Sequence, residues 1–210
     1  AASSDKQIRI NVMRVSQKLL LDLVFRFDNL NKVESEDLHN ILSRLGNILD
    51  QWVPIIDTDG VVTLTKEMIE VPEGSSSANL NAGDVISIYD LFYGMMLPSG
   101  NDAANVIAFV LGGTINGFVK QMNDKVATLG LKNTSFATPS GLDAENHFTT
   151  AYDLAQLTRI AMQNEEFCKA VSCKSATLNY GNPPYRRTLT NHNKLLKSFE
   201  GAVGVKTGFT

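Results

Sequence analysis

Three short motifs carry residue types that could do chemistry together, and the first stands at the start of the chain. Ser3 and Lys6 are three positions apart, a spacing that places both side chains on one face of a helix. A lysine amine with a lowered pKa can take the proton of a neighbouring serine hydroxyl, which turns the serine into a nucleophile. The spacing therefore predicts that Lys6 can reach and activate Ser3.

The second motif, Ser99–Asn101, reads Ser-Gly-Asn, and the third, Lys206–Gly208, reads Lys-Thr-Gly. We expect the second motif to form a turn between two helices, because Pro98 and the motif's own glycine break the helix. The third motif is expected at the end of a strand, where the missing glycine side chain lets a ligand backbone approach closely. A Ser-x-x-Lys, Ser-x-Asn and Lys-Thr-Gly trio in this order is typical of penicillin-binding proteins and class A β-lactamases.

Longer stretches around these motifs resemble one family. IYDLFYGMMLPSGNDAANVIAF, FVKQMNDKVATLGLKNTSFATPSGLDAENHFTTAYDLAQLTRIAM and GAVGVKTGFT closely resemble the D-alanyl-D-alanine carboxypeptidases of serine peptidase family S11, the low-molecular-mass penicillin-binding proteins. The resemblance covers residues 80–210 almost continuously. It implies an α+β, DD-peptidase/β-lactamase-like fold, a helical cluster plus an antiparallel sheet, which we expect to be incomplete at both ends of this chain.

The resemblance also implies a role for each motif residue. Ser3 would be the acylated nucleophile, Lys6 its general base, and Ser99 the group that passes a proton to the leaving amine. Ser99, Asn101, Lys206 and Thr207 would line one cleft. The implied substrate-binding residues are Asn101 for the acyl amide, Lys206 and Thr207 for the terminal carboxylate, Gly208, and Phe209, whose backbone amide would form the oxyanion hole with that of Ser3.

The implied function is that of a serine-type D-Ala-D-Ala carboxypeptidase, which acts through an acyl-serine intermediate on peptidoglycan stem peptides. The resemblance implies no metal and no cofactor, β-lactams as inhibitors, and an extracytoplasmic location, although AASSDKQIRINVM has no features of a signal peptide. Asp5 and Arg9 around Lys6 favour an alternative, a catalytically inactive relative that binds peptides or serves as an interaction module. A β-lactamase is less expected, because no Glu-x-x-Leu-Asn element occurs in the 60 residues after Ser99.

Apolar periodicity predicts the elements that must position these residues. We expect helices at 6–27, 35–52, 86–96, 101–112, 115–129 and 150–163, and strands at 61–65, 174–180, 185–191 and 202–207. Ser3 and Ser99 are 96 residues apart, roughly thirty more than the resemblance implies. We therefore interpret residues 1–210 as a single partial domain with a helical insertion at about 28–57.

Composition excludes several classes of partner and site. The 19 basic and 22 acidic residues give a net charge of -3, which provides no basic field for nucleic acid. The longest apolar run, Val106–Leu111, is far shorter than the roughly 20 residues of a membrane span. Cys168 and Cys173 lack a zinc-ligand spacing and are expected to be half-buried near a helix. His147 and His192 are expected to support loops.

Overall fold

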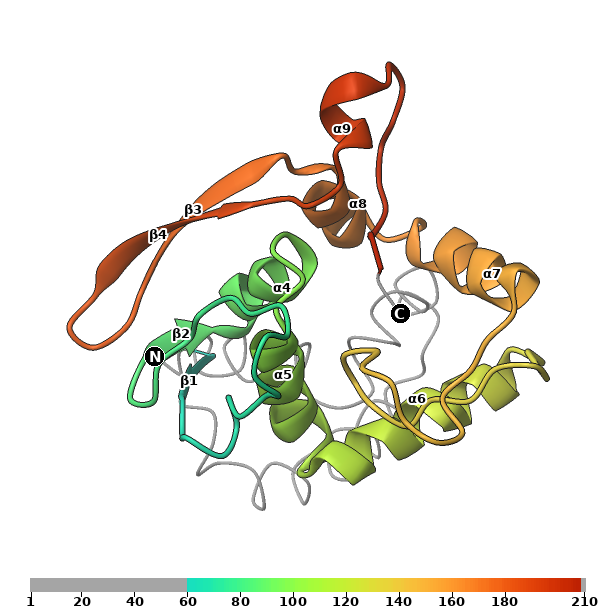
Figure 1. Cartoon of the computed structure of the whole chain (residues 1–210), viewed down its shortest axis with the longest axis horizontal. Coiled ribbons are helices and arrows are strands. Elements are labelled where there is room, and N and C mark those ends of the chain that lie inside the picture. Colours follow the sequence, from blue (N-terminus) through green and yellow to red (C-terminus); the bar gives the residue numbers. More distant parts are fainter. Residues whose placement is uncertain (1–59, 209–210) are drawn as a thin grey trace, which may run out of the picture.

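The computed structural model describes residues 60–208, and its elements follow one another as strands, helices and a late hairpin (Figure 1). The elements are β1 (Val61–Thr63), β2 (Val85–Ser87), α4 (Ile88–Met96), α5 (Asn101–Gly112), α6 (Ile115–Thr128), α7 (Ala151–Ala161), α8 (Glu165–Ser172), β3 (Ser175–Tyr180), β4 (Tyr185–Thr190) and α9 (Leu195–Ser198). Helices therefore dominate the middle and the longer strands come late, as the α+β prediction requires.

Helix α5 forms the centre of the main core. Nine of its twelve residues are buried, and it packs between α4 and α6. Val106 and Leu111 of α5 join Leu91 of α4 and Val62 of β1 in one cluster whose side chains are almost completely enclosed. Burial of each such side chain contributes about 1.5–3 kcal/mol, so this cluster fixes the position of α5.

The two sheets are antiparallel pairs. Val62 of β1 lies opposite Ile86 of β2, and Tyr180 of β3 lies opposite Tyr185 of β4. In the β3–β4 hairpin more buried and exposed side chains alternate, because successive strand residues point to opposite faces. The hairpin runs beside α4 and reaches toward β2 (Figure 1), where Gly181 donates a backbone hydrogen bond to the Val85 carbonyl, 2.9 Å.

A second core cluster joins the hairpin to the end of α4. Met96 and Leu97 pack with Val171 of α8 and Leu189 of β4, and all four are buried. This cluster lies directly before Ser99 in the chain, so the end of α4, α8 and β4 together support the turn that carries Ser99.

Most elements expected within the described range are confirmed, two expectations are wrong, and two helices were missed. Residues 85–87 form a strand, so the helix expected from 86 begins at Ile88, with the Ser87 hydroxyl accepting the Asp90 amide as its cap. Residues 202–207 are not a strand in the structure. Helices α8 and α9 were not predicted, and the expected helices 6–27 and 35–52, like the insertion 28–57, lie outside the described residues.

Within residues 60–208, no single helix is both long and apolar enough to cross a membrane. Helices α5 and α6 meet the length and composition test only when taken together, and their axes bend by 82° at the break between them.

Candidate active site

Ser99 lies in the short turn between α4 and α5. Its φ of 62° is in the left-handed region, which residues with a side chain seldom adopt. Two backbone hydrogen bonds hold the turn directly after this residue: Gly100 donates to the Gly94 carbonyl at 3.1 Å, and Asn101 to the Ser76 carbonyl at 3.0 Å. These bonds hold Ser99 in a conformation that the backbone alone disfavours.

Gly100 occupies a position where a larger residue would clash with neighbouring backbone atoms. A Cβ at this position would lie 2.6 Å from the Gly94 carbonyl oxygen and 2.8 Å from the Ala78 nitrogen, both backbone atoms. Only glycine therefore lets the turn pack this closely against residues 94 and 78.

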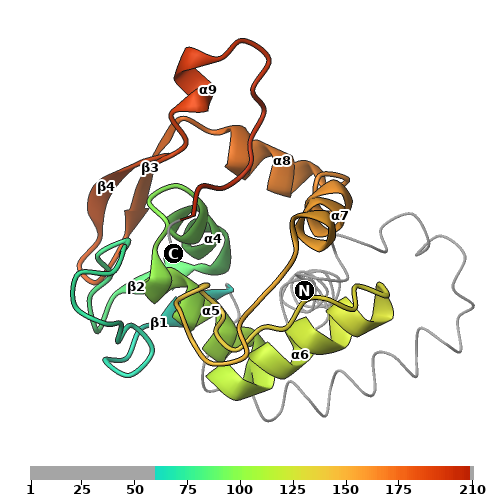
Figure 2. The ribbon, with the colours of Figure 1, turned by 45° about the vertical axis from the view of Figure 1, so that its right-hand side comes forward.

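Lys206 reaches Ser99 from the other end of the chain. Its Nζ donates to Ser99 Oγ at 2.8 Å and to the Thr207 carbonyl at 2.8 Å. The segment that carries it descends from α9 toward α4 (Figure 2). Lys206 is exposed as a residue, but protein atoms crowd its amine, and this desolvation lowers the pKa of Lys206 below its usual value.

The other site residues named from the sequence lie beside this pair or outside the described residues. Asn101 is the first residue of α5 and is 8% exposed, and Thr207 and Gly208 follow Lys206 on the surface. The structure thus joins Ser99 to Lys206 across 107 residues. Ser3, Lys6 and Phe209 lie outside the described residues, so their placement stays a prediction.

Sequence reasoning missed two supports of the site. Asp102 is 2% exposed and holds the segment before α4; its only sequence signal is an acid directly after the Ser-Gly-Asn motif. Asn191 is buried behind β4, where its Nδ2 donates to the Cys173 carbonyl at 2.9 Å and its Oδ1 accepts the Asn193 amide. The next amide, that of His192, donates to the Leu97 carbonyl at 3.0 Å.

The residues expected to be structural have structural surroundings. His147 Nδ1 accepts the backbone amide of Ala137 at 3.1 Å, which fits a loop support. Cys168 and Cys173 are free and half-buried in and after α8. No group of three or more histidine, cysteine, aspartate or glutamate side chains that could hold a metal ion occurs among residues 60–208.

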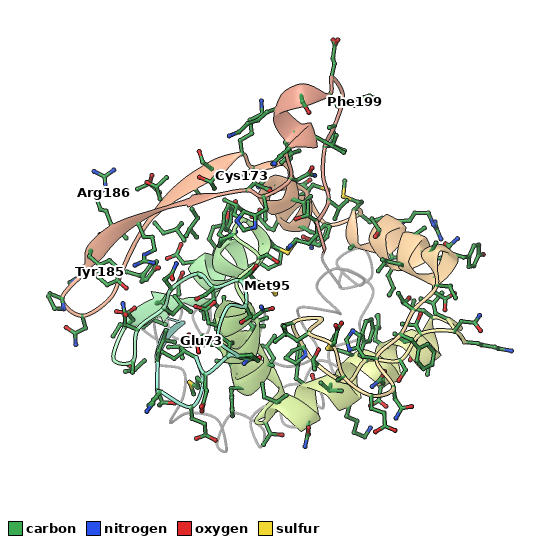
Figure 3. The ribbon with its side chains drawn as sticks, viewed as in Figure 1. Glu73, Met95, Cys173, Tyr185, Arg186 and Phe199 are labelled. Carbon is green, nitrogen blue, oxygen red and sulfur yellow. The ribbon has the colours of Figure 1, made fainter. Side chains whose placement is uncertain are left out.

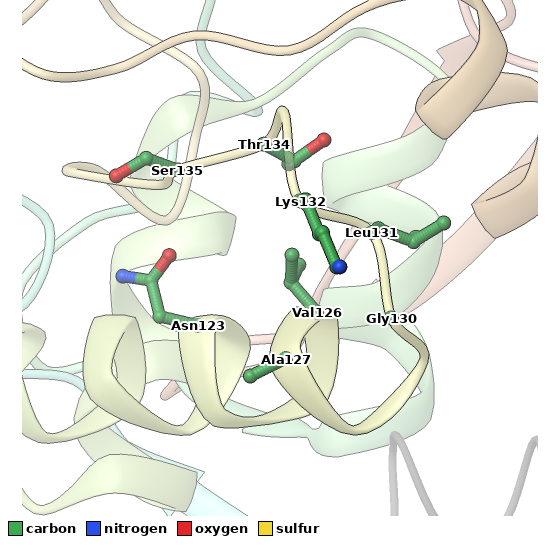
Figure 4. A pocket seen from close by; sticks show the side chains of 8 residues that line it. All are labelled: Asn123, Val126, Ala127, Gly130, Leu131, Lys132, Thr134 and Ser135. Atoms are coloured by element: carbon green, nitrogen blue, oxygen red, sulfur yellow. The ribbon is translucent and has the colours of Figure 1, made fainter.

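A separate open hollow of about 520 Å³ lies beside the end of α6 (Figure 4). Its walls come from the last turns of α6 and from the following segment, including Asn123, Val126, Lys132 and Thr134. Neither Ser99 nor Lys206 lines it, so the candidate active site is defined by the Ser99–Lys206 contact and not by this hollow.

The fold of this chain is similar to solved structures, and its sequence is similar to known proteins. The Streptomyces K15 DD-transpeptidase superposes with a TM-score of 0.69 at 34% identity, over 74% of this chain and 64% of that one. The D-alanyl-D-alanine carboxypeptidase DacF of Bacillus subtilis is 37% identical over 65% of this chain. DacB2 of Mycobacterium tuberculosis, of the same description, is 35% identical over 78%.

The chain spans only part of these relatives: its matches cover 35% of the Bacillus protein and 56% of the Mycobacterium protein. The profile of the D-alanyl-D-alanine carboxypeptidase family, Peptidase S11, matches residues 53–210. That region contains Ser99, Asn101 and Lys206, the residues around the 2.8 Å contact. The chain therefore belongs to the D-alanyl-D-alanine carboxypeptidase family S11.

Proposed function

We propose that this chain is a partial domain of a serine-type D-Ala-D-Ala carboxypeptidase, acting through an acyl-serine intermediate on peptidoglycan stem peptides that end in D-Ala-D-Ala. One observation carries the proposal. The Lys206 amine, whose pKa is lowered, donates to Ser99 Oγ at 2.8 Å, and both residues belong to motifs of the family.

The Ser99 hydroxyl is suited to deliver a proton. Because it accepts a hydrogen bond from Lys206, its own hydrogen is free to point at a second group. In the acylation step the nucleophile attacks the carbonyl carbon of the penultimate D-Ala, and the C–N bond to the last D-Ala breaks. The leaving amine takes the Ser99 proton, and Ser99 regains a proton from Lys6, which took it from the attacking Ser3 hydroxyl. Water then hydrolyses the acyl-serine and restores Ser3.

The remaining residues serve to bind and activate. The Lys206 charge and the Thr207 hydroxyl bind the terminal carboxylate, since a cation beside a hydroxyl suits an anionic group. Asn101 holds the acyl amide, and Gly208 leaves room for the peptide backbone before Phe209, whose amide helps to stabilise the oxyanion. In the described part of this site, the exposed positions of residues 206–208 support this assignment.

Ser3 and Lys6 complete the proposed machinery as nucleophile and general base. Their support is the Ser-x-x-Lys spacing in the sequence. β-lactams are proposed to acylate the same serine, because their strained amide mimics the scissile bond. The proposed substrate is a cell-wall peptide, so an extracytoplasmic location is part of the proposal.

Labelling with a fluorescent penicillin tests the proposal. The 210-residue chain is incubated with the reagent, digested, and the labelled peptide is mapped. Label on the peptide that contains Ser3, lost in Ser3→Ala and Lys6→Ala and strongly reduced in Ser99→Ala, supports the enzyme. Lys197→Ala, which removes an exposed lysine of α9, is the control and should keep the label.

One result would contradict the carboxypeptidase. If the folded wild-type chain takes no label and releases no D-alanine, yet still binds a D-Ala-D-Ala peptide, the chain is an inactive relative that acts as a peptide-binding module.

A further inference from the structure

Asp102 is a buried acid that the proposed reaction does not use. It is the second residue of α5 and its side chain is 2% exposed. Its Oδ1 accepts the amides of Ala78 at 2.8 Å and Ala103 at 2.9 Å. Its Oδ2 accepts the Ser77 hydroxyl at 2.6 Å and the Leu80 amide at 3.1 Å. In all four bonds Asp102 is the acceptor.

Four accepted bonds explain how a carboxylate can be buried here. Taking a charged group out of water is costly unless hydrogen bonds replace its hydration. The first turn of a helix also favours a negative charge. Asp102 therefore binds the segment 77–80 firmly to the start of α5.

That segment lies directly against the turn of Ser99. The Ser76 carbonyl accepts the Asn101 amide at 3.0 Å, and the Ala78 nitrogen is one of the atoms that leave no room for a Cβ on Gly100. On its other side the Ala78 carbonyl accepts Arg187 Nη1 of β4 at 3.1 Å. The segment 76–80 thus lies between the Ser99 turn and the β3–β4 hairpin and contacts both.

We propose that Asp102 is a positioning residue for the reaction, an inference that rests on the proposed function. By holding the segment 76–80 against the turn, Asp102 keeps Ser99 in its left-handed conformation, with its hydroxyl beside Lys206. The need for such support follows from the φ of 62° at Ser99, since a strained backbone persists only where its surroundings hold it.

The variant Asp102→Asn tests the inference. The asparagine side chain has one acceptor oxygen and one donor NH2 group. Its NH2 group therefore faces at least one backbone N–H group whose hydrogen bond Asp102 accepts, which brings two donors together. We expect the acylation rate constant for penicillin to fall by about tenfold or more, because small displacements of reacting groups have large effects on rate. The dissociation constant of the non-covalent penicillin complex should change by less than about twofold. A general loss of stability does not lower the acylation rate constant while leaving this dissociation constant unchanged.

Asp153→Asn is the matched control. Asp153 is also buried near the start of a helix, at 3% exposure in α7, and its Oδ2 accepts the Asn133 amide at 3.0 Å and the Thr134 hydroxyl at 2.9 Å. None of its contacts is with the segment 76–80 or the Ser99 turn. This variant should lose stability as well but keep the wild-type acylation rate constant.

A second measurement does not depend on the reaction. The amides of Gly100 and Asn101 donate to backbone carbonyls and not to Asp102, so their hydrogen exchange reports on the turn itself. We expect both to exchange at least about tenfold faster in Asp102→Asn than in Asp153→Asn. Ser77→Ala removes only the two hydrogen bonds of the Ser77 hydroxyl, the 2.6 Å bond to Asp102 and the bond from the Asn79 amide. It should speed exchange in the same way but more weakly, and it replaces Asp102→Asn if that variant does not fold.

The two measurements separate the inference from the proposed function. If the wild-type chain is not acylated, the proposed function fails, and faster exchange at residues 100 and 101 still supports positioning by Asp102. Unchanged exchange at these two amides overturns the inference, whether or not the chain is acylated. Equal acylation rate constants in Asp102→Asn and wild type also overturn it.

Discussion

Ser99 and Lys206 show how far residue types and motif order could predict the site. The resemblance to family S11 implies that both residues line one cleft, and the structure joins them at 2.8 Å. Asp102 could not be found in the same way, because an acid in the first turn of a helix is ordinary on an exposed surface. Its importance depends on burial and on contacts with residues 77–80, which are distant in the sequence.

A pH dependence of stability is expected from Lys206. Desolvation lowers its pKa in the folded chain, so the unfolded chain binds the proton more tightly. Stability from this group is therefore present above the ordinary lysine pKa of about 10.4, and it is lost as pH falls through the lowered pKa. Lys206→Met should remove this dependence.

Urea unfolding of wild type and Lys206→Met between pH 7 and 10 measures the effect. The unfolding free energy of wild type should increase relative to that of the variant as pH rises. The increase should be less than about 1 kcal/mol because Lys206 is exposed. Lys197→Met controls for the loss of a surface charge. A difference that stays constant or shrinks with pH would show that burial does not lower the pKa of Lys206.

Gly100 gives a steric prediction. Gly100→Ala puts a methyl group 2.6 Å from the Gly94 carbonyl oxygen, and overpacking of this kind costs about 1–3 kcal/mol of unfolding free energy. Gly208→Ala is the control for stability, since among the described residues beyond its chain neighbours no atom lies within 4 Å of its added Cβ. Equal midpoints of urea unfolding for the two variants would contradict the tight packing of the turn.

At the scale of elements, sequence signals predict the helices around the site better than the strands. Helix α5 was expected at 101–112 and lies at Asn101–Gly112, because Pro98 and Gly100 mark its start and Gly113, in the left-handed C-cap, marks its end. Strand β2 has only three residues, too few for an alternating pattern to show. The sequence pattern therefore places its apolar residues in the helix that follows.

The segment 202–207 shows why composition alone does not make a strand. Ala202, Val203 and Val205 suit a strand, but a strand also needs a hydrogen-bonded neighbour, and among the described residues none pairs with this segment. Gly201 has a φ of 82°, which turns the chain after α9. Lys206 therefore reaches Ser99 on an irregular segment. Among the side chains drawn in Figure 3, Phe199 is 67% exposed beside α9, and Arg186 points away from β4.

The cap of α4 gives a prediction for an element that supports the site. The Ser87 hydroxyl accepts the Asp90 amide at 3.0 Å, so Ser87→Ala should lower the unfolding free energy by about 1 kcal/mol. Ser87→Thr keeps the hydroxyl and should stay close to wild type. Chemical denaturation of the three proteins makes the comparison, and an alanine variant as stable as the threonine variant would argue against the cap.

At the scale of the whole molecule, the described residues contain two hydrophobic core clusters. The cluster around α5 begins with Val62, and the second cluster runs from Met96 to Leu189 and Val205. The family profile begins to match at residue 53. The start of this match supports the proposal that most of the segment 28–57 is an insertion outside the family fold.

Deleting residues 28–57 and joining the ends with a short Gly/Ser bridge tests this proposal. The variant should unfold in one cooperative transition, because it keeps all the residues that form the two core clusters within residues 60–208. Far-ultraviolet circular dichroism is the suitable probe, since the deletion removes Trp52, the single tryptophan of the chain. Deletion of Ser175–Thr190 with the same bridge is the control and should abolish cooperativity, because it removes the buried Tyr180 and Leu189. If the 28–57 deletion also loses its transition, those residues complete the core, and the partial domain must be redrawn to include them.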